Sequence, residues 1–154
     1  MITITLSLFW VTNRRKGIAN LPDCNKRSEA MEDHFENEFA LFWISGNILF
    51  FEYKPGVVIN LAAAQRIVAD RMQMQKEKVY PVLCDVRGIA DSDKAARDYL
   101  AQYGSVLTKA VSILANQTIS IVMISFYLKI SKPQVPTKVF SDKAKALEFL
   151  KAFV

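Results

Sequence analysis

The sequence predicts an α/β protein, a single domain built on a mixed, mostly parallel sheet of about five strands with about four helices. Apolar, β-branched or aromatic runs alternate with amphipathic segments from Phe39 onward, as in helices packed on a sheet. The first two runs, FALFWIS and ILFFEY, flank Gly46-Asn47, a pair that suits a tight hairpin turn. The 154 residues, of which 51% are hydrophobic, are enough for one core.

The predicted order from Phe39 is β-β-α-β-α-β-α-β-α, an opening hairpin followed by strand–helix units. Asn60 is a good N-cap for the first helix, which carries Leu61, Ala64, Val68 and Met72 at helical spacing. The stretch VYPVLCDV then reads as a near-continuous apolar strand from the centre of a sheet. The next helix is expected to turn Ala95, Tyr99, Leu100 and Tyr103 inward and to end at Gly104.

After a core strand at KAVSILA, the segment QTISIVMISFYLKI is rich in β-branched residues, but its spacing predicts a helix over 117–130. Six of its apolar residues fall on one helical face: Ile119, Val122, Met123, Phe126, Tyr127 and Ile130. This face forms part of the core, a dimer face or the wall of an apolar ligand cavity. TKVF is a short strand, and Ser141 is expected to cap the last helix.

Residues 1–30 are predicted to lie outside the fold, and the domain is expected to span residues 36–154. The first apolar run, MITITLSLFWV, precedes its basic cluster, which is the reverse of a secretory signal. It is also about half the length that crosses a bilayer, so no integral membrane span is expected. A membrane-surface anchor or an additional strand are the alternatives for this segment.

Charge and cysteine content narrow the class of protein. Of the net charge of +5, residues 1–30 carry +3, from five basic and two acidic side chains. Nucleic-acid binding by the domain is therefore not expected. Two cysteines distant in sequence, Cys24 and Cys84, do not make a disulfide framework, which favours the cytoplasm.

The sequence contains no catalytic, cofactor or metal motif. The one histidine is His34, which precedes the predicted domain, so a histidine-centred triad is not expected. His34, Cys24 and Cys84 share no metal-ligand spacing, and the glycines form neither a dinucleotide nor a phosphate-binding loop. We therefore predict no enzymatic activity, cofactor or metal.

The element order resembles the STAS family, and especially its SpoIIAA-like anti-sigma-factor antagonist relatives. The resemblance covers residues 36–154 and is carried by YPVLCDVRGIADSD, KAVSILANQ and PTKVFSDKAKALEFLKAF. The architecture is also similar to that of the CRAL-TRIO lipid carriers, so the fold does not choose a function. Antagonists of this family have an acidic strand end, a loop and a phosphorylatable hydroxyl in Asp-Ser-Ser/Thr-Gly.

Here Asp85 matches the acidic strand end and Ser92 is the nearest hydroxyl, but the loop reads Asp91-Ser92-Asp93-Lys94. This departure favours a helix start, with Ser92 at the N-cap or exposed in the first turn, over regulatory phosphorylation. A phosphate there would meet Lys94 or Arg97, but Asp91 and Asp93 would repel it. Asp85 and Arg87 are expected to form a structural ion pair, or Asp85 to face a ligand at the carboxyl edge of the sheet.

Two functions follow. The first is a non-enzymatic regulatory or protein-interaction module that acts through the loop 85–93 and the following helix, with a protein partner or a second copy of itself. Its candidate residues are Asp85, Arg87, Asp91, Ser92, Lys94 and Arg97. The alternative is a carrier or sensor of a small apolar or lipid-like ligand bound under the helix 117–130, beside Met123, Phe126 and Tyr127.

Overall fold

The computed structural model describes residues 33–116, 124 and 133–154. In this part of the chain the elements are β1 (Asp33–Glu36), β2 (Ala40–Ser45), β3 (Ile48–Tyr53), β4 (Val57–Ile59), α1 (Leu61–Gln75), β5 (Tyr80–Asp85), β6 (Ile89–Ser92), α2 (Lys94–Tyr103), β7 (Thr108–Leu114), β8 (Thr137–Phe140) and α4 (Lys143–Lys151). The predicted helix over 117–130 and the extension 1–30 lie outside the described residues, so both stay predictions.

The predicted mixed sheet is confirmed, with six strands rather than about five in the order β1-β2-β3-β5-β7-β8. The first three strands pair antiparallel, and β3, β5, β7 and β8 run parallel to their neighbours. Strands β4 and β6 pair with each other in a separate two-stranded parallel sheet. The fold class therefore stands.

The opening hairpin forms where the sequence predicts it. Gly46 and Asn47 join β2 to β3 with φ values of +55° and +60°, which is the left-handed backbone that a two-residue hairpin turn requires. Across the strands, the rings of Trp43 and Phe50 stack with centroids 5.0 Å apart. Turn chemistry and cross-strand aromatic packing thus fix the register of this hairpin.

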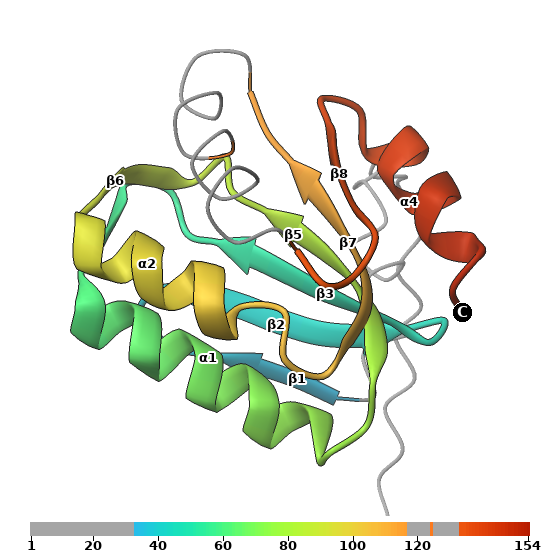
Figure 1. The fold of residues 1–154 in the computed structure, drawn as a ribbon, viewed down its shortest axis with the longest axis horizontal. Coiled ribbons are helices and arrows are strands. Elements are labelled where there is room, and N and C mark those ends of the chain that lie inside the picture. Colours follow the sequence, from blue (N-terminus) through green and yellow to red (C-terminus); the bar gives the residue numbers. More distant parts are fainter. Residues whose placement is uncertain (1–32, 117–123, 125–132) are drawn as a thin grey trace, which may run out of the picture.

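The helices divide between the two faces of the sheet (Figure 1). Helices α1 and α2 pack side by side on one face, and α4 packs on the other, against β5, β7 and β8. Successive side chains of β5 point to opposite faces of the sheet and so contribute to both cores. Val82 belongs to the core under α1 and Leu83 to the core under α4. The buried strand is apolar on both sides for this reason.

Each described helix begins at a polar cap. Asn60, as predicted, accepts a hydrogen bond from the Ala63 backbone N–H. The last helix is capped by Asp142, not by Ser141 as expected, because the Asp142 carboxylate accepts from the Lys145 N–H at 2.9 Å. Aspartate and serine are equally good caps, so the residue type does not show which one caps the helix. The cap is Asp142 because the helix starts at Lys143.

The inward face of α2 also differs from the expected one. Ala96 is fully buried and Ala95 is exposed, and Tyr103 is 40% exposed. The helix starts at Lys94 and is short, so a shift of one residue in the predicted stripe changes which alanine faces the core.

Three short strands were not predicted. Strand β1 begins at Asp33, before the predicted boundary at residue 36, and pairs His34 with Trp43. Strands β4 and β6 have three and four residues, too few to show a period of two. They form because each pairs with the other at the carboxyl end of the main sheet.

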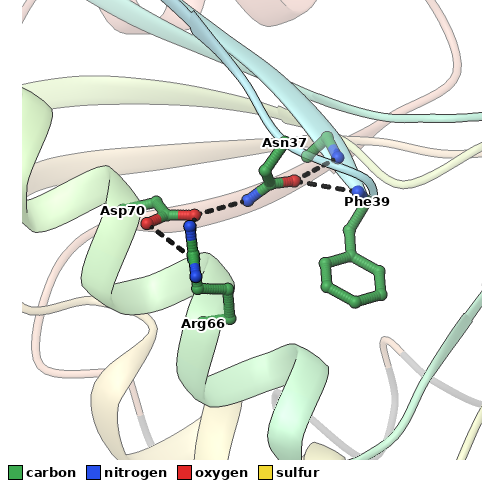
Figure 2. Close-up of polar contacts among 5 residues, drawn as sticks. Asn37, Phe39, Arg66 and Asp70 are labelled. Carbon is green, nitrogen blue, oxygen red and sulfur yellow. Dashed lines mark hydrogen bonds and ion pairs between the residues drawn. The ribbon is translucent and has the colours of Figure 1, made fainter.

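A polar network holds the β1–β2 turn against α1 (Figure 2). The Asn37 side-chain oxygen accepts from the backbone N–H groups of Phe39 and Ala40 at 2.8 and 2.9 Å. Its Nδ2 donates to Asp70 Oδ2 at 2.8 Å. Asp70 is buried and also accepts from Arg66 Nε at 2.8 Å. Asn37 thus donates a hydrogen bond to a buried carboxylate and also accepts the backbone hydrogen bonds that close the β1–β2 turn.

We expect Asn37→Ala to lower the free energy of unfolding by about 1–3 kcal/mol, because it removes three hydrogen bonds and leaves Asp70 less satisfied. Urea unfolding followed by circular dichroism measures this difference. Asn116→Ala, at an exposed asparagine, is the matched control and should change stability by less than about 0.5 kcal/mol. Equal effects of the two substitutions would contradict this role of Asn37.

Candidate functional site

The carboxyl end of β5 carries the predicted ion pair. Asp85, only 5% exposed, accepts from Arg87 Nη2 at 2.6 Å and from Arg87 Nε at 2.9 Å through its second oxygen. The Arg87 backbone N–H donates to the same carboxylate at 3.1 Å. Hydrogen bonding to Asp85 raises the pKa of the Arg87 guanidinium. The pair is therefore bidentate, and it holds in place the turn by which the chain leaves β5.

The turn continues through Gly88, which lies against the end of β3. A Cβ atom at Gly88 would stand 2.2 Å from the Tyr53 carbonyl oxygen and 2.5 Å from that of Lys54. Only glycine fits there. An open depression of about 270 Å³ lies beside it, lined in part by Glu52, Asp85 and Arg87.

Ser92 is not at the helix start that the sequence predicted. It is the last residue of β6 and is 4% exposed, whereas Asp93 is the N-cap of α2. The Asp93 carboxylate accepts from the Ala96 N–H at 2.6 Å. Pairing with β4 draws Ser92 into the sheet, so its hydroxyl is covered by the protein rather than presented to solvent.

The charged residues around Ser92 are already engaged. Arg97 Nη1 donates to the Ser92 carbonyl oxygen and lies 3.5 Å from its Oγ. Lys94 pairs instead with Asp98, one helical turn on, at 2.6 Å. The Asp91 carboxylate accepts from the Ser92 N–H at 2.8 Å. Of the two basic residues considered near Ser92, Arg97 contacts it and Lys94 pairs elsewhere.

We call one surface of the protein the platform and define it by four residues: Val58, Leu61, Asp91 and Lys94. Val58 and Asp91 are partners in the β4–β6 register, and Leu61 and Lys94 are the first residues of α1 and α2. All four are exposed, Val58 by 58% and Leu61 by 38%. Figure 1 places β6 and the first turns of both helices at one end of the molecule. The platform therefore combines apolar area with charges of both signs.

A cavity of about 110 Å³ is lined by residues of the main sheet and of helices α1 and α2. The described part of its walls is almost entirely apolar and includes residues of β3, β5, β6, β7, α1 and α2. Among the residues that the structure describes, those lining it are Phe51, Tyr53, Arg71, Val82, Cys84, Val86, Ile89, Leu100, Gly104, Val111, Ile113 and Ile124. Met123, Phe126 and Tyr127, which the sequence placed beside a cavity, lie outside the described residues.

Arg71 and Gln75, two of the three buried polar residues of α1, were not predicted from the sequence. Arg71 is 2% exposed and Gln75 is 1% exposed, and Arg71 lines the cavity. The signal was present, because both continue the helical stripe that begins with Ala64 and Val68. A polar pair on an otherwise apolar stripe indicates an internal polar contact or a ligand group.

The described residues contain no group of three or more His, Cys, Asp or Glu side chains placed to hold a metal ion. Cys84 lies half-buried in the cavity wall. Burial and, to a smaller extent, the nearby Asp85 charge raise the pKa of its thiol to about 12, against a lowering effect of Arg71. The thiol therefore stays protonated at neutral pH and is not an activated nucleophile.

We expect Gly88→Ala to lower the free energy of unfolding by about 1–3 kcal/mol, because the new methyl group must displace the Tyr53 and Lys54 carbonyls. The measurement is urea unfolding at constant pH. Ala90→Ser, at an exposed position of β6, is the control and should be close to neutral. A neutral Gly88→Ala would show that the turn does not depend on this close approach.

The Cys84 thiol should make stability depend on pH above neutrality. Between pH 9 and about 12 an unfolded thiol loses its proton while the folded one keeps it, so the folded state loses stability as pH rises. The stability difference between the parent chain and Cys84→Ala should therefore fall by up to about 1.4 kcal/mol per pH unit above pH 9. Urea titrations from pH 8 to 10 test this, and a constant difference would contradict it.

A solved structure with a similar fold is an uncharacterised protein of the DUF3478 family with a SpoIIAA-like fold from Shewanella loihica PV-4. It is 15% identical, with a TM-score of 0.54 over 75% of this chain and 98% of the other, which confirms the predicted SpoIIAA-like fold.

No curated protein matches the chain. The family model described as "Domain of unknown function (DUF7793)" matches residues 42–154, which include β3 to β8 and every described helix. The chain belongs to the DUF7793 family.

Proposed function

We propose that the chain is a non-enzymatic, STAS-type interaction module whose protein partner binds the platform and the adjoining loop 85–93. The observation that carries this proposal is the exposure of Val58, 58% in a strand directly beside Asp91. An exposed apolar centre rimmed by charges is typical of a protein-binding surface. The resemblance to anti-sigma-factor antagonists points to the same part of the fold.

The rigidity of this surface supports the proposal. The two-pronged Asp85–Arg87 pair, the close approach of Gly88 and the Asp93 cap fix the backbone on both sides of β6. Arg87 nevertheless keeps 43% of its side chain exposed. A surface already held in its binding geometry loses little conformational entropy when a partner docks.

The platform is proposed to bind without a phosphorylation switch. Ser92 is 4% exposed, so a kinase could reach its hydroxyl only after the end of β6 opens. Asp91 and Asp93 would also repel a phosphate there. No helix in the described part of the chain is long and apolar enough to cross a membrane. A cytoplasmic location belongs to the proposal and rests on the cysteine content.

A photo-crosslinking amino acid at position 58 tests the interaction. We expect crosslinks to one protein in lysate of the source organism, because Val58 is the more exposed of the two apolar residues of the platform. Leu61→Glu in the same chain should reduce them by at least tenfold. Position 139 in β8, where valine is 39% exposed, is the matched control and should not capture that protein.

Light scattering on the purified chain separates a partner from self-association. A dimer that Leu61→Glu dissociates would identify the partner as a second copy. Absence of crosslinks from position 58, or equal capture from positions 58 and 139, would overturn the proposal that the platform is the binding surface.

The apolar cavity favours a second candidate function, a sensor or carrier of a small apolar ligand. At about 110 Å³ it is of the same order as an engineered protein cavity that binds benzene. Its apolar walls suit a ligand with a hydrocarbon body. The volume suits a small body of this kind, so this candidate is narrower than the lipid-like ligand that the sequence suggested.

A further inference from the structure

Arg71 is the one charged residue among the described residues that line the cavity. The residue is 2% exposed, so the cavity wall contains a cation removed from water. Placing a guanidinium in such a site is costly unless its hydrogen-bonding groups are satisfied. An arginine in an otherwise apolar cavity therefore gives that cavity a chemical preference.

The position of Arg71 is fixed by Gln75. The Gln75 Nε2 group donates to the carbonyl oxygens of Lys78 and Leu107 at 3.1 and 2.8 Å. Its Oε1 is thereby turned toward α1, where it accepts from Arg71 Nη1. Arg71 also interacts with the protein beyond Gln75. The guanidinium is therefore held in one place, and its five N–H donors allow it to serve protein and ligand together.

Cys84 lies close enough to Arg71 for the arginine charge to lower the pKa of the thiol. Burial and Asp85 outweigh that effect and hold the pKa at about 12. The thiol is thus neutral at physiological pH. Asp85, the acidic residue next in sequence, is bound two-pronged to Arg87.

We propose that the cavity binds a small carboxylate with a short hydrocarbon body, its carboxylate on Arg71 and its body against Val82, Val111 and Ile113. This inference rests on the second candidate function and names its ligand class. A guanidinium matches a carboxylate in planar, two-pronged geometry. The volume of about 110 Å³ suits a ligand of roughly six non-hydrogen atoms, by comparison with benzene in a slightly larger engineered cavity.

The test titrates the full chain with butyrate and with butyramide, which has the same shape and no charge, and follows the methyl resonances of Val82, Val111 and Ile113. We expect saturable shifts with butyrate and at least tenfold weaker binding of butyramide. Arg71→Met should reduce butyrate binding to the level of butyramide and leave butyramide binding unchanged. Arg66→Met, on the solvent side of the same helix with 63% of its side chain exposed, is the matched control and should keep the preference.

Each other outcome has one meaning. Equal binding of butyrate and butyramide would overturn the carboxylate proposal while the apolar-ligand function stands. Binding of neither would overturn both. A butyrate preference that survives Arg71→Met would overturn the assignment to Arg71. If Arg71→Met does not fold, the parent chain still decides between carboxylate and amide. Val111→Phe, which fills the cavity, must then abolish butyrate binding if the cavity is the site.

Discussion

Strand β5 hydrogen-bonds to β3 on one side and to β7 on the other, and its side chains divide between the two cores. Val82 packs under α1, Leu83 packs under α4, and Cys84 faces the cavity. A strand buried on both faces must be apolar throughout. The first charged residue along it, Asp85, therefore appears where the strand leaves the sheet. The Asp85–Arg87 pair and the loop 85–93 begin at that residue.

The parts of the fold predicted from the sequence are those with strong local signals. Gly46-Asn47 determined the hairpin, and the apolar runs determined β5 and β7. The short strands β4 and β6 were missed because neither has a period of its own and each exists only through pairing with the other. Such a non-local partner cannot be seen in a window of the sequence.

The candidate site shows the same division. The Asp85–Arg87 pair was predicted because two opposite charges lie two residues apart at a strand end, and that geometry is local. The burial of Ser92 was not predicted, because it follows from the unseen β4–β6 pairing. Arg71 and Gln75 were missed for a different reason. An arginine near the end of a helix is usually solvated, and this expectation outweighed the position of Arg71 on the stripe that begins with Ala64 and Val68.

The platform and the cavity share β6. Ile89, at the start of that strand, lines the cavity and pairs with Val57 of β4, while Asp91 further along lies in the platform. A molecule in the cavity would therefore touch the strand whose outer residues would meet a partner. Because packed elements shift between discrete arrangements rather than deform continuously, occupancy of the cavity and docking at the platform need not be independent. The two candidate functions are then compatible in one domain. Binding of the small ligand in the cavity would change the affinity of the platform for its protein partner. Such coupling requires that a ligand bind the partner-bound and partner-free forms with different affinity, and the shared strand β6 is the element through which that difference would arise.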